Sequence, residues 1–374
     1  MSAAAPGAGT RPAGPPPRWV GLALVPVVNL LAALVASGAI VLAVGENPLE
    51  AMQVLVTGAF GDGESWGYTL FYATNFIFAG LAVAVAFHAG LFNIGGEGQA
   101  YIGGLGVGLA CLAFGGWPFW FVLPMALAAA MLFGAGWAYL PGYLQAYRGS
   151  HIVITTIMFN FLASALMTYL MVNVLIVPGQ QSPESRVFDA SAQLPSLHEV
   201  LGRLNIDVAV SPLNLAFPIA LIASAMVWGF IWHTSGGYAL RVVGKSERAA
   251  VYAGISPSRN IVLAMALSGA LAGLVGINEI MGVQHRLILS FTGGVGYVGI
   301  AVALMGRNHP VGICLAAVLF GALYQGGSEL AFVMPNISRE MVVVIQGLVI
   351  LFCGALEHLF QPTLNSLFRG RAAP

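Results

Sequence analysis

Long apolar runs, separated by glycine, proline and charged residues, follow one another along the chain from Trp19 onward. A helix needs about 20 apolar residues to cross the hydrocarbon core of a bilayer, and most runs approach that length. The pattern predicts about ten membrane-spanning helices, near residues 19–44, 67–89, 98–116, 118–140, 151–177, 213–234, 259–282, 293–306, 311–331 and 341–360. We therefore expect an all-α polytopic membrane protein in which glycine interrupts some of the helices.

The two ends of the chain lack this apolar pattern. Residues 1–18 are rich in proline, glycine and alanine, which predicts a disordered tail. The apolar run that follows, residues 19–44, is 26 residues long and exceeds the short core of a cleavable signal peptide, so we expect a retained helix. We therefore predict one transmembrane domain, residues 19–362, followed by a second tail, residues 363–374.

Composition narrows the class of protein. Hydrophobic residues make up 58% of the chain and charged residues only 7%, about a quarter of the usual charged fraction. So few charges cannot cover the surface of a soluble domain, which excludes a cytosolic enzyme and makes the lipid bilayer the expected environment. The net charge is zero and no basic run exceeds a pair, so a nucleic-acid partner is also excluded.

The distribution of Arg and Lys predicts the orientation in the membrane. An even number of spans places both termini on the same side, and cytoplasmic loops are richer in Arg and Lys. With the N terminus inside, ten of the 14 basic residues lie on the cytoplasmic side and four lie outside. We therefore predict that the N and C termini are both cytoplasmic.

Two loops stand out from the apolar pattern. The outer loop, residues 178–212, is rich in proline and serine and carries charges of both signs. The inner loop, residues 235–259, is basic, with four Arg and Lys residues against the single acidic residue Glu247. A basic cytoplasmic loop of this kind indicates a docking surface for another protein.

Polar residues interrupt the apolar pattern most clearly between Gly90 and Gly104, where six glycines accompany Asn93, Glu97 and Gln99. Glycine at this density breaks helices. Broken backbone at membrane depth is tolerated only beside protein or a water-filled cavity, and an ionisable group there is a functional candidate. Asn93, Glu97 and Gln99 are therefore candidate pathway residues. The alternatives are a wet interfacial loop, or glycines that only allow close helix packing.

The second half contains a weaker echo of this segment, again a glycine-rich approach to a short span, at Phe291–Gly306. Paired interrupted helices in the two halves of a chain point to the core of a transporter. Asn278 and Glu279, which follow the GxxxG pattern of Gly269 and Gly273, are further candidates for pathway or gating roles. A helix-end role at the headgroups is the simpler interpretation of each polar residue taken alone.

Enzyme signatures are incomplete wherever they begin. His198 and Glu199 start a zinc-binding HExxH motif, but Gly202 stands where the second histidine is required. Gly244 and the two residues after it end like a phosphate-binding loop, yet Ala239 occupies the position of the first glycine. The three cysteines form no metal-binding pair. No catalytic residue, metal site or ATPase site is predicted in this chain.

The inner loop carries a resemblance to a known family. The stretch GYALRVVGKSERAAVYAGISPSRNIVLAMALSGALAGLVG, Gly237–Gly276, combines a basic start, an alanine pair and re-entry into the membrane. It resembles the coupling loop of ABC importer permeases, which lies in a cleft of the ATPase subunit. The resemblance implies a docking set of small and basic residues: Arg241, Gly244, Lys245, Ala249, Ala250 and Gly254.

A second motif narrows the resemblance. GLFNIGGEGQ, Gly90–Gln99, is similar to the signature of permeases grouped with the branched-chain amino acid, ribose and simple-sugar importers, and most similar to the nucleoside branch. Supporting runs lie at Gly149–Phe161 and Gly299–Ile313, although Ile152 stands where that branch frequently has Glu. The similarity extends over most of residues 70–356.

This resemblance implies a permease domain at residues 19–362 that holds no cofactor itself. ATP and Mg would be bound by a partner ABC ATP-binding subunit. A second homologous permease would complete the pore, and an extracytoplasmic solute-binding protein or lipoprotein would deliver nucleosides to it. The resemblance also implies the bacterial cytoplasmic (inner) membrane.

Three alternatives remain open on the sequence. The first is an ABC permease for a simple sugar such as ribose. The second is an ion-coupled secondary transporter with Glu97, Glu279 or Glu329 as the ion site. The third is a channel or a membrane scaffold held together by GxxxG contacts alone.

Overall fold

The computed structural model describes residues 24–352 of the 374-residue chain. The two predicted tails, residues 1–18 and 363–374, lie outside the described residues. The chain divides into two compact units, and each is considered by itself. The larger unit is Met52–Val333, and the smaller unit combines the chain on either side of it.

The larger unit is entirely helical apart from loops and one isolated bridge between Ser196 and Asn214, within the part of the chain that the structure describes. Its helices are α3 (Gly63–His88), α4 (Gly96–Phe114), α5 (Phe119–Arg148), α6 (Ile152–Leu170), α7 (Leu197–Gly202), α8 (Ala216–His233), α9 (Ser235–Lys245), α10 (Glu247–Tyr252), α11 (Pro257–Gly273), α12 (Val295–Met305) and α13 (Pro310–Val333). Most of α2 (Pro48–Phe60) also belongs to it.

The smaller unit pairs the start of the described chain with its end. Helices α1 (Val25–Ala43) and α14 (Arg339–Ile350) pack against each other in it. The side chain of Asn336 donates a hydrogen bond from Nδ2 to Oε1 of Glu46 at 2.8 Å. The unit therefore joins segments that are almost 300 residues apart in sequence.

A helix lies at each of the ten predicted spans. Within residues 24–352, however, six helices are long and apolar enough to cross a membrane, or seven if α1 and α2 form one bent span. Helix α12 has 11 residues and therefore extends only about 16 Å. The glycines of α4 lower its mean hydropathy below that of a membrane span. Helix α14 has 12 residues. Helix α2, between the first two predicted spans, is an element that the apolar pattern did not reveal.

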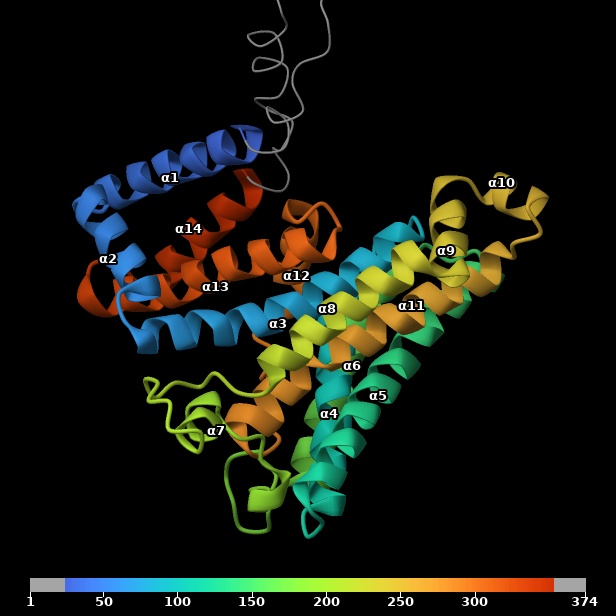
Figure 1. Ribbon diagram of the computed structural model, residues 1–374, viewed down its shortest axis with the longest axis horizontal. Helices are drawn as coiled ribbons and strands as arrows, with labels where there is room; N and C mark the ends of the chain where they lie inside the picture. Colours follow the sequence, from blue (N-terminus) through green and yellow to red (C-terminus); the bar gives the residue numbers. More distant parts are fainter. Residues whose placement is uncertain (1–23, 353–374) are drawn as a thin grey trace, which may run out of the picture. The chain divides into compact units, whose positions relative to one another are not determined.

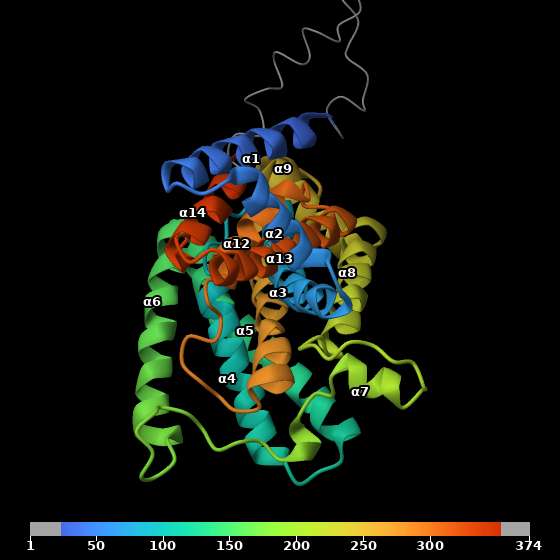
Figure 2. The same ribbon diagram turned by 90° about the vertical axis from the view of Figure 1, so that its left-hand side faces the viewer.

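Helix α3 lies at the centre of the larger unit, with 83% of its most apolar window buried. Helices α8, α11, α12 and α13 pack around α3, and α11 also lies along α5 (Figures 1 and 2). The GxxxG pattern explains the close fit of α11, because a Cβ on Gly269 would lie 2.2 Å from the carbonyl oxygen of Gly134 in α5. Glycine therefore brings these two backbones into contact.

Two interruptions divide the membrane helices, as the glycine-rich segments predict. The first break, residues 89–95, separates α3 from α4, and Gly90 has a left-handed φ of +74° there. The second break, residues 285–294, follows a π-helical extension of α11 at Ile277–Gln284 and precedes α12. Left-handed residues stand at both of its ends, His285 and Gly294 among them.

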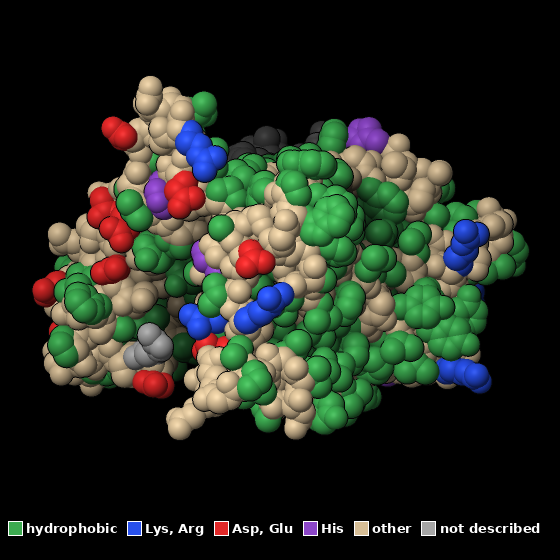
Figure 3. Space-filling model, turned by 90° about the horizontal axis from the view of Figure 1, so that it is seen from below, with side chains coloured by type: hydrophobic (Ala, Val, Ile, Leu, Met, Phe, Trp, Pro, Cys, Tyr) green, Lys and Arg blue, Asp and Glu red, His purple; other side chains and the backbone are tan. Residues whose placement is uncertain are grey.

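The inner loop is helical rather than irregular. The Thr234 side chain accepts a hydrogen bond from the Gly237 backbone N–H at 3.1 Å and caps the start of α9. Ser246 caps α10 in the same way through the Ala249 N–H. In the space-filling view basic side chains stand at the right-hand edge, beside a broad hydrophobic surface (Figure 3).

Candidate functional site

The first break is held by a pair of buried side-chain amides. Asn93 donates from Nδ2 to Oε1 of Gln99 at 2.9 Å, and Gln99 donates back from Nε2 to Oδ1 of Asn93 at 3.1 Å. Asn93 also bonds to Ser268 of α11 at 2.8 Å, and the Ser268 hydroxyl donates to the Ala82 carbonyl of α3 at 2.6 Å. Both amides are 1% exposed. This amide pair therefore ties α3, α4 and α11 together at the break.

Asn160 of α6 holds the same segment from another side. Its Nδ2 donates to the carbonyl oxygen of Ile94 at 3.0 Å, and its Oδ1 accepts from the backbone N–H of Gly98 at 2.9 Å. The same amide reaches the hydroxyl of Tyr297 in α12 at 3.2 Å. Sequence reasoning did not single out Asn160, although a buried amide inside an apolar run was a signal that could have found it.

Glu97 joins the first break to the second. Its Oε1 accepts hydrogen bonds from the Thr292 hydroxyl at 2.6 Å and the Gly294 backbone N–H at 2.9 Å, and its Oε2 accepts from the Gly296 N–H at 2.8 Å. The first N–H groups of a helix have no partner within the helix, and a carboxylate is favoured at that end. Glu97 therefore acts as the N-terminal cap of α12 from a distant part of the chain.

Asn278 and Glu279 belong to a separate cluster, on the π-helical extension. Asn75 of α3 donates to Oε1 of Glu279 at 2.6 Å and accepts from Nδ2 of Asn278 at 2.9 Å. Asn214 donates to Oδ1 of Asn278 at 3.0 Å. Asn75, Asn214 and Asn278 are fully buried, whereas Glu279 is partly exposed. π-helical turns inside α-helices are frequent at functional sites.

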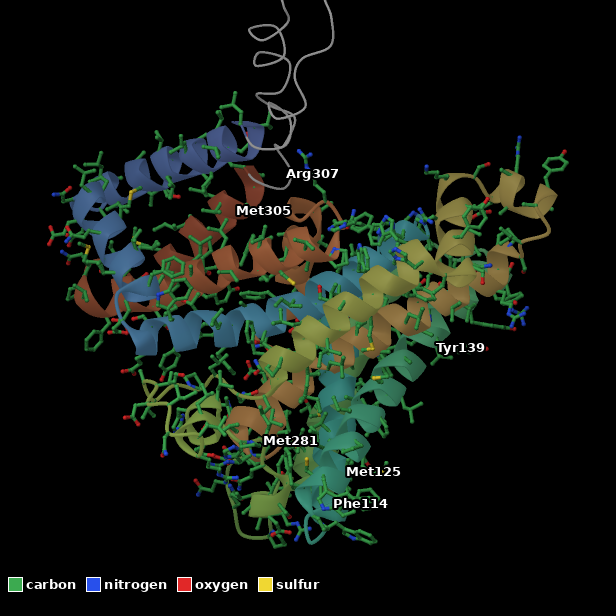
Figure 4. The ribbon with its side chains drawn as sticks, viewed as in Figure 1. Phe114, Met125, Tyr139, Met281, Met305 and Arg307 are labelled. Atoms are coloured by element: carbon green, nitrogen blue, oxygen red, sulfur yellow. The ribbon has the colours of Figure 1, made fainter. Side chains whose placement is uncertain are left out.

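The predicted pathway residues are therefore in three places. Asn93 and Gln99 form the amide pair, Glu97 caps α12, and Asn278 with Glu279 forms the cluster on the extension. Figure 4 places Met281 of that extension toward the Phe114 end of α4, away from α9 and α10. The structure thus distributes the five residues along the unit instead of gathering them at one point.

A polar cavity of about 720 Å³ opens beside the second cluster. It has a volume typical of small-molecule sites. Tyr72, one turn before Asn75 on α3, lies in its wall, and the Tyr72 ring lies 5.9 Å from that of Tyr324. The polar cavity is lined by residues of α2, α3 and α13: Thr57, Gly58, Gly61, Asp62, Glu64, Ser65, Tyr68, Tyr72, Gln325, Ser328 and Glu329.

Hydrogen bonding fixes the mouth of the polar cavity. Asp62 caps α3, because its Oδ1 accepts a hydrogen bond from the Ser65 backbone N–H at 2.7 Å. This bond stabilises the ionised carboxylate and lowers the pKa of Asp62 below its ordinary value. On the opposite wall, Gln325 donates weakly to Glu329 at 3.4 Å. The polar cavity therefore carries negative charge at neutral pH, together with hydroxyl and amide groups.

The residues of the predicted docking set on the inner loop differ in their exposure to solvent. Lys245, Ala249 and Gly254 are exposed, Arg241 is half-buried, and Ala250 is fully buried within the chain itself. Ala250 therefore offers no surface to a partner. The most prominent side chain is one that sequence reasoning missed, Tyr252 of α10, which is 95% exposed.

Gly244 connects the inner loop to the first break. A Cβ at Gly244 would lie 2.3 Å from the His88 carbonyl oxygen and 2.8 Å from the Gly90 backbone nitrogen. The end of α9 therefore rests directly on the turn between α3 and α4. No larger residue fits at position 244 without displacing one of these backbones.

Residues 24–352 contain no group of His, Cys, Asp and Glu side chains arranged to hold a metal ion. The carboxylates described above are instead engaged in helix caps and amide contacts.

Comparison with known proteins places the chain among transport subunits. A sequence profile described as "Branched-chain amino acid transport system / permease component" matches residues 66–354. The guanosine ABC transporter permease protein NupP of Bacillus subtilis is 36% identical over 88% of this chain and 92% of its own length. The nucleoside ABC transporter permease protein NupB of Lactococcus lactis is 33% identical over 88% of this chain and 90% of its own.

A third relative carries a different solute in its name. The glucose ABC transporter permease protein TsgB13 of Haloferax volcanii is 33% identical over 96% of this chain and 94% of its own length. Similarity at this level therefore extends to proteins named for nucleosides and to one named for a sugar.

Proposed function

This chain belongs to the branched-chain amino acid transport system permease component family, and from that premise we propose that it moves nucleosides into the cell as the permease of an ATP-driven importer. It is a multi-pass membrane subunit of an ABC importer and has no catalytic domain of its own. The nucleoside substrate is the proposed part. It is supported by the guanosine and nucleoside permeases to which the chain is similar.

The polar cavity is the observation that carries the nucleoside assignment. A nucleoside is uncharged and presents a flat base together with hydroxyl groups. Tyr68 and Tyr72 offer ring surfaces on which a base can stack, and Gln325 and Ser328 offer hydrogen-bonding groups to the ribose. We assign the polar cavity as the outer opening of the solute route, with Asn278 and Glu279 next along it.

The inner loop is the proposed site of energy input. The partner ABC ATP-binding subunit, which binds ATP and Mg, docks on α10 and the turn that follows it, where Ala249, Tyr252 and Gly254 are exposed. Its movement passes from Gly244 to the first break, and from α4 through Glu97 to α12. Such rocking of interrupted helices around a central site is the usual physical basis of alternating access.

The remaining parts of the proposal concern topology and partners. Both termini lie on the cytoplasmic side of a bacterial cytoplasmic membrane. A second homologous permease completes the route, and an extracytoplasmic solute-binding protein or lipoprotein docks near the outer loop, residues 178–212. The charge distribution along the chain supports this orientation.

Uptake of radiolabelled solutes tests the proposed function. Cells with the gene intact, deleted or restored are supplied with guanosine, adenosine, uridine, ribose and glucose. We expect deletion to abolish nucleoside uptake, and an ATPase-dead partner subunit to abolish it equally. Loss of sugar uptake alone would contradict the nucleoside assignment and favour the second candidate, a sugar permease, which the Haloferax relative supports.

The same experiment separates ATP-driven from ion-coupled transport. Undiminished uptake in the absence of a working ATPase would contradict the importer mechanism. It would favour a secondary transporter with an ion at Glu97, Glu279 or Glu329. The hydrogen bonds to Glu97 argue against that role, because its carboxylate already accepts three of them at the start of α12, from Thr292, Gly294 and Gly296.

A further inference from the structure

A second cavity lies at the other end of the larger unit, between the end of α3 and the inner loop. Its volume is about 410 Å³. It is separate from the polar cavity, since the two share no residue, and the proposed solute route does not use it. The basic cavity, as we name it, is lined by Phe87, His88, Tyr238, Arg241, Val242, Gly244 and Lys245.

The basic cavity has a positive lining with no acidic counterpart. Arg241 and Lys245 are one turn apart on α9 and both contribute to the wall. Neither side chain forms an ion pair with another residue in the part of the chain that the structure describes. No Asp or Glu side chain lines the cavity. An anionic ligand would therefore meet two cations without competition.

Arg241 is the residue that most clearly lacks a partner. Its Nε is buried and makes no hydrogen bond. A buried charged donor without an acceptor is costly, and such groups are normally paired. A guanidinium is also the side chain best suited to a phosphate, because its planar donors match two oxygens at once. The unpaired Nε of Arg241 therefore favours a phosphate group as the ligand of this cavity.

The rest of the lining is apolar and faces the surface. Phe87 and Val242 contribute hydrocarbon walls, and Tyr238 is 56% exposed. Tyrosine at such a position is typical of the boundary between headgroups and acyl chains. Helix α9 buries Leu240 and Val243 against the protein, as an amphipathic helix lying along a membrane surface does.

We propose that the basic cavity binds the phosphate headgroup of an anionic phospholipid. Basic pockets between membrane helices on the cytoplasmic side bind anionic headgroups, and each Lys or Arg near the surface strengthens the attraction. The apolar lining distinguishes a lipid from free phosphate, because it accommodates the start of an acyl chain beside the phosphate. The exposed side chains that suit a protein partner, Val251 and Tyr252, belong to α10 and do not line the cavity.

The position of this site gives the lipid a means of influencing transport. His88 and Gly244 line the cavity and also form the contact between α9 and the first break. His88 is fixed there by a hydrogen bond from Nε2 to the Asn308 carbonyl oxygen at 3.1 Å and by its ring contact with Trp232. A bound headgroup therefore stabilises the contact between α9 and the first break, through which the ATPase is proposed to act.

Native mass spectrometry of the full-length chain, co-purified with its partner subunits, tests this site. The protein is exchanged into micelles containing equal amounts of phosphatidylglycerol and phosphatidylcholine, and the lipids that stay bound are counted. We expect selective retention of phosphatidylglycerol, and about fivefold weaker retention after Arg241→Gln. Arg148→Gln is the matched control, since Arg148 is exposed at the end of α5 and does not line the cavity.

A second variant and a competition with inorganic phosphate distinguish the possible ligands. Lys245→Gln replaces an exposed side chain at the rim, so it reports on the site even if Arg241→Gln fails to fold. Retention of phosphatidylglycerol at the wild-type level in both variants would overturn the proposal, as would equal retention of phosphatidylcholine. Displacement of the lipid by inorganic phosphate would assign the site to a free anion instead. A loss of partner subunits from Arg241→Gln without any change in lipid would assign the cavity to protein docking.

Discussion

The two breaks in the membrane helices are held in different ways. The first break is fixed from three sides by buried amides, through Asn93, Gln99 and Asn160. The second break is held at its end by the carboxylate of Glu97 and, further back, by the hydroxyl of Tyr101, which accepts from the Ser290 N–H at 2.8 Å. The first break is therefore fixed by buried side-chain amides. The second break is held at its start by hydrogen bonds from the outer loop, where Ser185 bonds to Leu287, and only its end near α12 depends on contacts from α4.

This difference indicates the direction in which movement passes through the molecule. The inner loop rests on the first break at Gly244, and the first break leads directly into the turn of α4 that carries Glu97. A rigid first break transmits displacement, and the end of the second break nearest α12, which Glu97 contacts, responds to it. Without the hydrogen bonds of Glu97, movement of α4 would no longer be transmitted to the second break.

Replacing Glu97 by leucine should have the largest effect. Leucine leaves the donors of Thr292, Gly294 and Gly296 without their acceptor, which we expect to cost about 3 kcal/mol. Nucleoside uptake should fall about 100-fold, because the start of α12 no longer follows α4. The measurement is initial uptake rate, normalised to the amount of protein in the membrane.

Glu97→Gln provides the graded comparison. Its amide keeps one acceptor oxygen at the start of α12, so intermediate activity is expected. Wild-type uptake by both variants would show that the carboxylate does not join the two breaks.

Replacing Asn93 by leucine should have the next largest effect. The change leaves Ser268 and Gln99 without an amide partner in a buried site, which we expect to destabilise the protein by about 2 kcal/mol. Thermal unfolding in detergent measures this loss. Asn173→Leu is the control, because Asn173 is exposed and bonds only within its own helix. Equal melting temperatures for the two variants would contradict a rigid first break.

Gly244→Ala should separate ATP hydrolysis from transport. The added methyl group collides with the backbone at His88 and Gly90, and such overpacking costs about 1–2 kcal/mol. We expect the ratio of solute moved to ATP hydrolysed to fall several-fold while the ATPase stays bound. The matched control is Gly229→Ala in α8, where an added Cβ meets nothing within 4 Å. An unchanged ratio in Gly244→Ala would show that this contact does not transmit movement.

Removing the ion pair at the start of the second break should have the smallest effect. Arg286 lies 2.7 Å from Glu184, and the two side chains are 41% and 28% exposed. A pair this exposed is screened by water and salt, so Glu184→Gln should change stability by less than about 1 kcal/mol. Unfolding at low and high salt checks this expectation. A large loss would mean that this ion pair, and not Glu97, is the main side-chain contact that holds the second break.

Much of the framework could be predicted from local sequence patterns. Apolar runs located the helices, and glycine density located both breaks, because these features act over neighbouring residues. Helix α2 escaped prediction since Glu50 and Gln53 interrupt its apolar pattern. Among the described residues, six or seven helices have the length and hydropathy of a full span, against ten predicted. Glycine-rich α4 and the short α12 are apolar but do not reach that hydropathy or length.

The candidate site was less predictable because its contacts are distant in sequence. Glu97 was recognised as an ionisable group at a break, but its bond to Thr292 spans 195 positions. Gly244 was assigned to docking by resemblance, and its contact with Gly90 depends on how α9 folds back on α3. A single sequence contains no signal that pairs such positions. The polar cavity likewise required three helices to be placed together.

Hydrogen exchange at the first break tests the central claim, that action of the ATPase on the inner loop reaches the solute route through this segment. The assembled transporter is compared without nucleotide and with ATP and vanadate, and exchange of the backbone amides of residues 89–96 and 290–296 is followed. The account predicts that both segments change together in the wild-type protein, and that Gly244→Ala abolishes the change. Identical exchange in both nucleotide states, while ATP hydrolysis and solute uptake proceed normally, would contradict it.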